Sequence, residues 1–355
     1  MRCLVAFDKF KGCLDAYAAG AACARGIRKA LPHCLITVVP VADGGDGTTA
    51  LIAAARGLKT IHVHATGATG ERVTVPVALE GDTAWFDLAS VCGLALVPPV
   101  MRNPLVTTTR GVGEVILALA RAGVRTFNIG AGGSATVDGG RGALEALGFS
   151  FNGKADDTQV PDYVRHARFN ILCDVRNPLN GPRGAACVFG PQKGASASDV
   201  AVLENRLEEF AGMMPAGMGS LERGGAAGGF AAGFAAFLGA RLCDGAAVCL
   251  DAVGFDAAAA DADVIVTGEG SIDATTLNGK GPGAVLVRGL ESGVPVYAVA
   301  GRVRDAEALA AAGFRKTLAA SAPDAPEGTV TDADIAREKI CKAAAQMFGS
   351  YEINC

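Results

Sequence analysis

Four glycine-rich segments of this chain carry charged side chains whose types indicate one kind of chemistry. They are residues 43–47 (Asp-Gly-Gly-Asp-Gly), 130–136 (Gly-Ala-Gly-Gly-Ser-Ala-Thr), 190–194 (Gly-Pro-Gln-Lys-Gly) and 267–273 (Thr-Gly-Glu-Gly-Ser-Ile-Asp). Glycine lets backbone N–H groups approach an anion closely, because no Cβ stands in the way. Carboxylates beside such loops repel a phosphate unless a divalent cation lies between them. The combination predicts a nucleotide held with Mg²⁺, and therefore phosphoryl transfer.

Carboxylates in these loops are candidates for two roles. Asp43 and Asp46 lie among three glycines and suit either a cation or a base that takes a proton from a hydroxyl. A turn with a helix N-cap would need only one aspartate. Asp174, which follows a predicted strand, is a third candidate for the base. Glu269 and Asp273 are four residues apart and are expected to share one cation, so metal ligation is predicted for Asp43, Asp46, Glu269 and Asp273.

Lysines beside the same loops supply positive charge. Lys9 and Lys11 follow the first predicted strand together with Asp8, and are expected to bind a carboxylate or phosphates. A solvated helix start with Asp8 as its N-cap explains that segment equally well. Lys193 lies on a Pro-Gly loop and Lys280 follows the 267–273 segment, so both are expected to neutralise phosphate charge.

Backbone donors are expected in two of the loops. Gly132, Gly133 and Ser134 run from a strand into a helix, a ready site for a substrate anion, although close helix–strand packing also demands small residues. Gly268 and Gly270 are expected to contact the nucleotide. No histidine lies in any of the four segments, so a general base should be a carboxylate.

Composition limits the class of protein. With 355 residues, half of them apolar and 19% charged, the chain should form about two domains with large cores. A net charge of −4 without blocks of like charge favours neither nucleic-acid nor membrane binding. The eleven cysteines are odd in number and form no Cys-x-x-Cys, so buried reduced thiols and a cytoplasmic location are expected.

Short apolar runs alternate with helical patterns near both ends of the chain. Strands are predicted at residues 3–7, 35–41, 60–65, 72–79, 83–88, 126–129, 169–174, 186–189, 262–266, 294–299 and 316–319. Helices are predicted at 16–31, 48–56, 112–122, 139–147, 199–213 and, as a buried helix, within 224–240. The alternation is typical of parallel α/β sheets, whereas residues 60–88 indicate an antiparallel meander.

This pattern predicts two α/β domains. One is a parallel-sheet domain built from both chain ends, residues 1–60 and 256–355, and the other is an inserted middle α/β domain, residues 61–255. The tract 322–328, rich in Pro, Asp and Ala, is linker-like. Chain order does not give the oligomeric state.

In this order, the segments resemble the bacterial glycerate kinase family, the branch typified by glycerate 2-kinase. The match includes residues 8–12, 40–47, 105–111, 132–136, 173–175, 177–179, 189–195, 224–229 and 267–280, nearly the whole chain. The resemblance implies ATP-dependent phosphorylation of D-glycerate with Mg²⁺, 2-phosphoglycerate being the favoured product. Val137, Ser271 and Thr275 depart from the family's usual Asn, Arg and Gln, and the stretch 151–170 is shorter, which affects the fine geometry of the site.

Two other classes of function remain as alternatives. An NAD-dependent hydroxy-acid oxidoreductase is disfavoured, because no strand leads into a complete Gly-x-Gly-x-x-Gly with an acidic residue about 20 positions later. A non-catalytic nucleotide or metabolite sensor would keep the same scaffold, its chemistry weakened at Val137 and Ser271. Release of ADP on adding D-glycerate and Mg-ATP separates the three.

Overall fold

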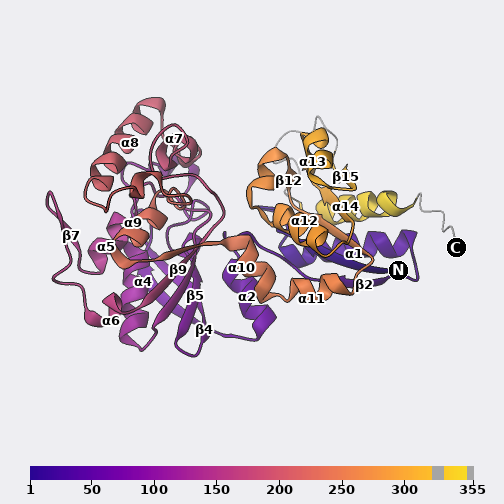
Figure 1. The fold of residues 1–355 in the computed structure, drawn as a ribbon, viewed down its shortest axis with the longest axis horizontal. Helices are drawn as coiled ribbons and strands as arrows, with labels where there is room; N and C mark the ends of the chain where they lie inside the picture. Colours follow the sequence, from indigo (N-terminus) through magenta and orange to yellow (C-terminus); the bar gives the residue numbers. More distant parts are fainter. Residues whose placement is uncertain (322–331, 350–355) are drawn as a thin grey trace. The chain divides into compact units, whose positions relative to one another are not determined.

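The computed structural model describes residues 1–321 and 332–349, and the linker-like tract at 322–328 lies outside them. The chain divides into two compact units. Unit 1 comprises Met1–Asp43 and Ala246–Cys355, and unit 2 comprises Gly44–Gly245. Each contains a largely parallel sheet packed with helices, so the predicted two-domain α/β class is confirmed (Figure 1).

The unit boundaries differ from the predicted positions after residues 60 and 255. Helix α2 (Thr48–Arg56) belongs to unit 2, because it packs on β4 (Arg72–Glu80) and β5 (Thr83–Asp87). At the second boundary, Leu250 of α10 (Gly245–Ala252) joins a core cluster of unit 1. In both places side-chain packing assigns a helix that chain order leaves ambiguous.

The sheet of unit 1 is parallel, and both ends of the chain contribute to it, as predicted. Its order is β15-β13-β11-β1-β2, namely Lys316–Ala319, Val296–Ala300, Val264–Gly268, Arg2–Phe7 and Leu35–Val38. Successive side chains of a strand point to opposite faces. Val5 and Phe7 therefore pack in one core cluster, and Leu4 and Ala6 in another.

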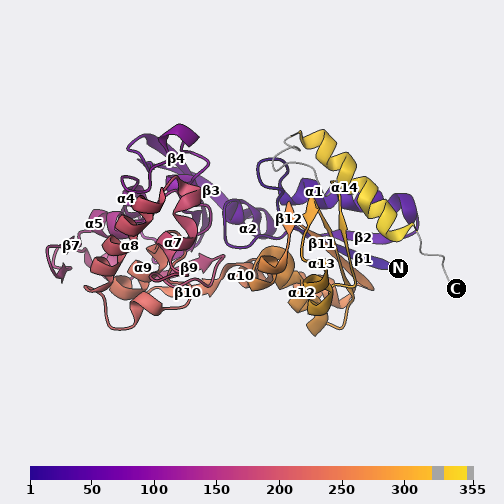
Figure 2. The same cartoon turned by 90° about the horizontal axis from the view of Figure 1, so that it is seen from above.

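Helices cover both faces of this sheet (Figure 2). Helices α1 (Ala16–Ala30) and α14 (Ala333–Phe348) pack against the Val5 face. The other face is covered by α11 (Phe255–Ala260), α12 (Gly281–Glu291) and α13 (Ala306–Ala312). Burial on both faces explains why the strands read as continuous apolar runs.

Helices α1 and α14 pack closely at Gly26. A Cβ built there would lie 2.1 Å from the Cys341 carbonyl oxygen, so a methyl group has no room. Gly26→Ala is expected to lower the free energy of unfolding by about 1–3 kcal/mol through overpacking. Thermal denaturation checks this. Gly219→Ala is the control, since its Cβ would have no neighbour nearer than 3.9 Å; equal melting temperatures for both variants would contradict the packing.

The sheet of unit 2 is mixed, and the antiparallel meander predicted in residues 60–88 is confirmed. Its order is β10-β9-β6-β5-β4-β3, namely Arg241–Asp244, Arg168–Cys173, Thr126–Gly130, Thr83–Asp87, Arg72–Glu80 and Lys59–Thr66. Strands β3, β4 and β5 pair antiparallel, and β5, β6, β9 and β10 pair parallel. The carboxyl ends of four parallel strands therefore meet at one edge of this sheet.

Further short elements complete the chain. In unit 2 they are α3 (Ala89–Cys92), η1 (Pro99–Met101), α4 (Arg110–Arg121), α5 (Arg141–Ala146), β7 (Ser150–Phe151), β8 (Ala155–Asp156), α6 (Asp162–Arg165), α7 (Ala185–Phe189), η2 (Pro191–Lys193), α8 (Ala197–Ala211), η3 (Met218–Ser220) and α9 (Phe230–Leu238). In unit 1 they are β12 (Ser271–Ile272), η4 (Ala274–Asn278) and β14 (Arg302–Val303).

The strand predicted at residues 186–189 is wrong, because this segment forms helix α7. Its first turn buries Ala185 and Ala186 while Val188 is exposed, a one-sided pattern that a run of four apolar residues does not reveal. The buried helix predicted within 224–240 is present as the shorter α9, which begins at Phe230 after a series of glycine turns.

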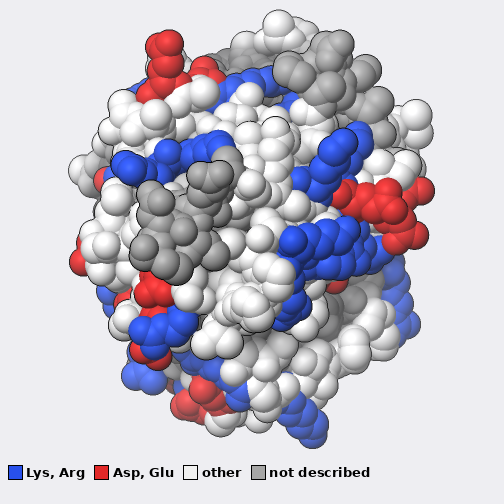
Figure 3. All heavy atoms as spheres, turned by 90° about the vertical axis from the view of Figure 1, so that its right-hand side faces the viewer, with Lys and Arg blue, Asp and Glu red and all other residues white. Residues whose placement is uncertain are grey.

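Two observations concern the surface. In the described residues, no helix combines the length and the apolar character needed to cross a membrane. On the face drawn in Figure 3, basic side chains are interspersed with acidic and uncharged ones. This mixture agrees with a net charge of only −4.

Candidate active site

The predicted site residues of unit 2 follow its parallel strands. Ser134 belongs to the loop after β6, and Asp174 comes directly after β9. Asp46 precedes α2 on the 43–47 loop and is exposed. Because carboxyl ends of neighbouring parallel strands share one edge, these loops lie side by side, the usual place for ligands in α/β sheets.

Gly132 is the point where three of these segments converge. A Cβ built on it would lie 2.6 Å from Asp174 Oδ2 and 2.6 Å from the Cα of Gly45. Its N–H faces the carbonyl oxygen of Gly44 at 3.4 Å, so this predicted anion donor is directed at the protein. Next to it, a Cβ on Gly133 would lie 3.7 Å from the Cβ of Asp46. The glycines therefore permit close approach of loop to loop.

Lys193 is the most informative side chain of this group, because it is a buried lysine only 3% exposed. Its Nζ donates to Ser134 Oγ at 2.9 Å and to the Thr136 carbonyl oxygen at 2.7 Å. Burial lowers the pKa of Lys193 to about 8, against the opposing effect of the nearby Asp174 carboxylate. The structure thus brings together Lys193 and Ser134, two residues predicted from separate motifs.

The loop that carries Lys193 is held in place by its flanking residues. Pro191 opens the 3-10 turn η2, and Gly194 closes it with a φ of +100°. A Cβ on Gly194 would also lie 2.3 Å from the Arg102 carbonyl oxygen. The alternative of an exposed surface lysine therefore does not apply.

Asp87 was not predicted as a site residue, although it ends β5 at the same sheet edge. Its carboxylate is buried and accepts hydrogen bonds from the N–H groups of Gly47 (2.9 Å) and Thr49 (3.1 Å) and from Thr49 Oγ1 (2.7 Å). Burial raises the pKa of Asp87 to about 6, although these hydrogen bonds lower it. Asp87 therefore ties down the loop on which Asp46 lies. An acidic residue at the end of a parallel strand was the available signal.

Asp87→Asn is expected to loosen this loop. An amide retains one acceptor oxygen but turns its NH₂ toward a backbone N–H, which costs about 1–3 kcal/mol locally. Amide hydrogen exchange of residues 44–50 should accelerate by about tenfold or more, and kcat/KM should fall with it. Asp82→Asn, in an exposed turn, is the matched control. Unchanged exchange in the Asp87 variant would contradict this role.

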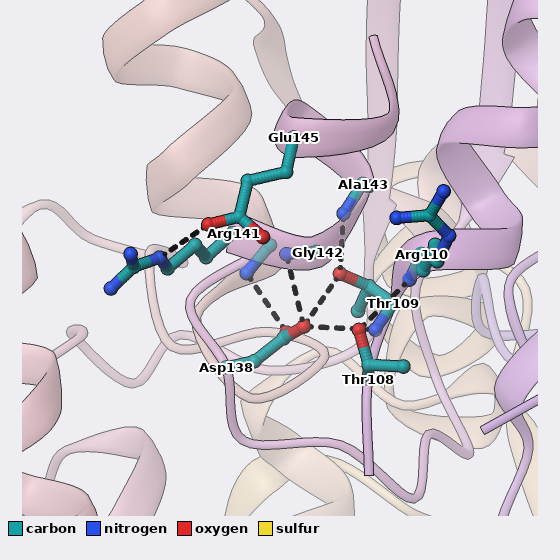
Figure 4. A network of polar contacts seen from close by, with 9 residues as sticks. Thr108, Thr109, Arg110, Asp138, Arg141, Gly142, Ala143 and Glu145 are labelled. Atoms are coloured by element: carbon teal, nitrogen blue, oxygen red, sulfur yellow. Dashed lines mark hydrogen bonds and ion pairs between the residues drawn. The ribbon is translucent and has the colours of Figure 1, made fainter. Parts of the chain in front are cut away.

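Asp138 shows how the 130–140 loop continues into helix α5. Its carboxylate accepts from the Thr109 N–H and hydroxyl, both at 2.8 Å, and from the N–H groups of Gly140 and Gly142 (Figure 4). The network joins the first turn of α4 to the first turn of α5. Asp138 is thus a structural anchor for the segment that follows Ser134.

Unit 1 contains a second group of predicted residues, again at carboxyl ends of parallel strands. Asp8 follows β1, Asp43 comes after β2, and Glu269 follows β11. Asp8 is almost fully buried, and burial together with the Asp43 charge raises its pKa well above the usual value. Burial raises the pKa of Glu269 to about 7, with Lys280 opposing and Asp43 reinforcing the shift. The three carboxylates are therefore electrostatic neighbours.

Basic and capping residues surround this acidic group. Lys280 Nζ donates to Thr275 Oγ1 at 3.2 Å, and Asp273 caps η4 by accepting from the Thr275 N–H and hydroxyl. Lys9 is half-buried and Lys11 exposed. The capping role that is the simplest explanation of an Asp at a turn is thus present at Asp273.

The two glycines predicted to contact a nucleotide differ in their surroundings. A Cβ on Gly268 would lie 1.9 Å from the Val299 carbonyl oxygen, which gives this glycine a packing reason. At Gly270 the nearest atoms would be 3.9 Å away, in the backbone of Phe10 and Lys11. Gly270 therefore borders the loop after β1 and leaves space beside it.

The acidic group of unit 1 fits a cation bound together with phosphates. Within residues 1–321 and 332–349, no three acidic, histidine or cysteine side chains lie close enough to bind one metal ion. Mg²⁺ is usually held by one or two carboxylates plus water and substrate phosphates. Neighbouring carboxylates that raise one another's pKa, as Asp43 does for Asp8 and Glu269, suit that arrangement.

Comparison with known proteins agrees with this site. The sequence model of the glycerate kinase family matches residues 3–350. The glycerate kinase of Bacillus subtilis (strain 168) is 39% identical over 333 residues, 87% of each chain, and the glycerate 2-kinase of Escherichia coli (strain K12) is 37% identical over 329 residues, 86% of each. A crystal structure named for glycerate kinase 2 from Salmonella typhimurium LT2 is similar with a TM-score of 0.77 and 33% identity, covering 98% of this chain and 97% of that one. The chain therefore belongs to the glycerate kinase family and is a kinase.

Proposed function

We propose that the protein transfers the γ-phosphoryl group of ATP to a hydroxyl of D-glycerate, with Mg²⁺ bound beside the nucleotide. The observation that carries the proposal is Lys193, whose ammonium group is buried yet directed at two uncharged oxygens of the glycine loop. Burying a cation without a fixed anion is costly, and such positions are characteristic of sites that receive an anionic substrate. Membership of a kinase family supports ATP as the co-substrate.

In unit 2, the residues around Lys193 are assigned to the substrate anion and its hydroxyl. The N–H groups of Gly133 and Ser134 and the remaining Lys193 proton bind an anionic oxygen. Asp174 takes the hydroxyl proton, because it is half-buried against Gly132 and lies near Lys193. Asp46 is exposed and is the second candidate for this role.

In unit 1, the carboxylates are assigned to the metal and the lysines to phosphate. Asp43 and Glu269 would hold Mg²⁺, which neutralises and orients the phosphates of the nucleotide when bound. Lys280, near Glu269, neutralises phosphate charge. Asp273 already caps η4 and is a weaker candidate for the metal. The 2-position of glycerate is favoured because the E. coli relative is named glycerate 2-kinase.

The pKa of Lys193 gives this proposal a pH dependence. Only the ammonium form attracts the anion, and burial lowers the pKa of that group to about 8 in the free protein. Because kcat/KM reports groups of the free enzyme, kcat/KM should fall as the pH rises through about 8. Lys193→Arg keeps its charge over this range, so its residual activity should lack the fall. A wild-type profile that stays flat well above pH 8 would contradict the assignment.

One assay separates the proposal from its alternatives. The wild-type protein is incubated with D-glycerate, Mg-ATP and NAD⁺, and ADP and NADH are measured together. The proposal requires ADP release that depends on both glycerate and Mg²⁺. Formation of NADH would instead support an oxidoreductase, and tight ATP binding without turnover would support a sensor.

A further inference from the structure

A cavity of about 420 Å³ lies in unit 2 between helix α8 and the segment that follows Thr136. Its volume falls within the range of small-molecule sites, roughly 300–1,000 Å³. Within the described part of the chain, none of the residues assigned above to phosphoryl transfer lines it. It is therefore a separate feature from the Lys193 group and needs its own explanation.

The inner wall of the cavity is apolar. Val137, Leu207 and Phe210 line it and are each almost fully buried, and Met213 adds a half-buried thioether. Leu207 and Phe210 lie three residues apart on α8, which places them on the same helix face. A ring or branched chain would find aromatic and aliphatic contacts here, and its burial supplies most of the binding free energy.

A guanidinium group stands at the rim of this wall. Arg206, one position before Leu207 on α8, donates from Nη1 to the Leu105 carbonyl oxygen at 2.8 Å. A guanidinium has five N–H donors in a planar fork that matches a carboxylate. In residues 1–321 and 332–349, no acidic side chain lies within 4.0 Å of it. Arg206 therefore retains donors and a positive charge that the described residues do not neutralise.

The other charged residues of the cavity are compensated or outward. Arg141 pairs with Glu145 at 2.7 Å (Figure 4). Asp138 accepts from Thr109, Gly140 and Gly142, so its negative charge is already stabilised by the protein. Glu209 is exposed on α8. One uncompensated positive charge selects a singly charged anion over a phosphate dianion.

We propose that this cavity is a second binding site, for a small organic monocarboxylate with an apolar body. The carboxylate pairs with Arg206, and the ring or branched chain packs on Phe210 and Leu207. The bound acid also touches Val137, the neighbour of the Thr136 carbonyl that holds Lys193. Binding is measured without ATP or glycerate, so the test does not depend on the proposed function.

The test uses 3-phenylpropionate as the probe and its uncharged amide, 3-phenylpropanamide, as the matched ligand. Both are titrated into the full-length protein by ligand-observed NMR. Wild type should bind one acid saturably, and should bind the amide about fivefold more weakly. Arg206→Met should remove this preference while leaving amide binding unchanged, and Arg206→Lys should keep part of it. Met213→Trp, which fills the cavity, should weaken both ligands.

Four results would overturn the proposal. They are the lack of saturable binding of 3-phenylpropionate, equal affinity of acid and amide, an unchanged preference in the folded Arg206→Met variant, and displacement of the probe by ATP. The last would assign the cavity to the nucleotide site. Phenyl phosphate is a further ligand, and tighter binding of this dianion would contradict the charge argument. Melting temperatures of the variants verify that each is folded, and the two independent substitutions keep the test decisive if one of them is not.

Discussion

Replacing Lys193 by methionine is expected to lower kcat by about three orders of magnitude while the protein stays folded. A cation placed against a transferring phosphoryl group typically contributes a factor of this size or more. Methionine has a similar length and fills the same buried space without a charge. The substitution also removes the cost of burying an ammonium, so the melting temperature should not fall sharply.

The comparison variant is Lys154→Met, which alters an exposed lysine of the same unit. Its kcat should equal that of wild type. Steady-state kinetics at saturating D-glycerate and Mg-ATP, with melting curves for both variants, provides the measurement. If Lys193→Met turned over glycerate at a near-normal rate, Lys193 would have no part in the chemistry.

Asp174→Asn is expected to have the second large effect, lowering kcat by about a hundredfold to ten-thousandfold. The amide has the shape of the carboxylate but does not accept the hydroxyl proton. KM for glycerate should change much less than kcat. Because the Asp174 charge raises the pKa of Lys193, the fall in kcat/KM near pH 8 should also move to lower pH.

Asp46→Asn distinguishes the two candidate bases of unit 2. If Asp174 is the base, the exposed Asp46 should affect kcat much less, and its variant should keep the wild-type pH profile. A large loss of kcat in Asp46→Asn together with normal turnover in Asp174→Asn would transfer the role to Asp46.

Much of the fold could be predicted because local patterns decide it. Strands β1, β6 and β15 are short apolar runs after or before turn residues, and the predicted ranges agree with the observed ones within two residues. Segment 186–189 failed because four apolar residues fit a strand or a helix face equally well. The unit boundaries failed because α2 is assigned by packing on β4 and β5, which involves residues distant in sequence.

The site was predictable as separate motifs and only partly as an arrangement. Residue types identified Lys193 and Ser134 independently, and the structure joins them by a hydrogen bond. Asp43 and Asp46 read as one loop, yet they belong to different compact units. Asp87 was missed because a lone aspartate after a strand carries no motif, and its role depends on loop N–H groups about 40 residues away.

The central claim is tested most directly by identifying the product. Protein, D-glycerate, ATP and Mg²⁺ are incubated together and followed by ³¹P NMR with proton correlation. The account predicts ADP and a phosphate monoester in equal amounts, the phosphorus coupled to the proton on carbon 2 of glycerate. ADP accompanied by inorganic phosphate alone, or ATP that remains unchanged, would contradict it.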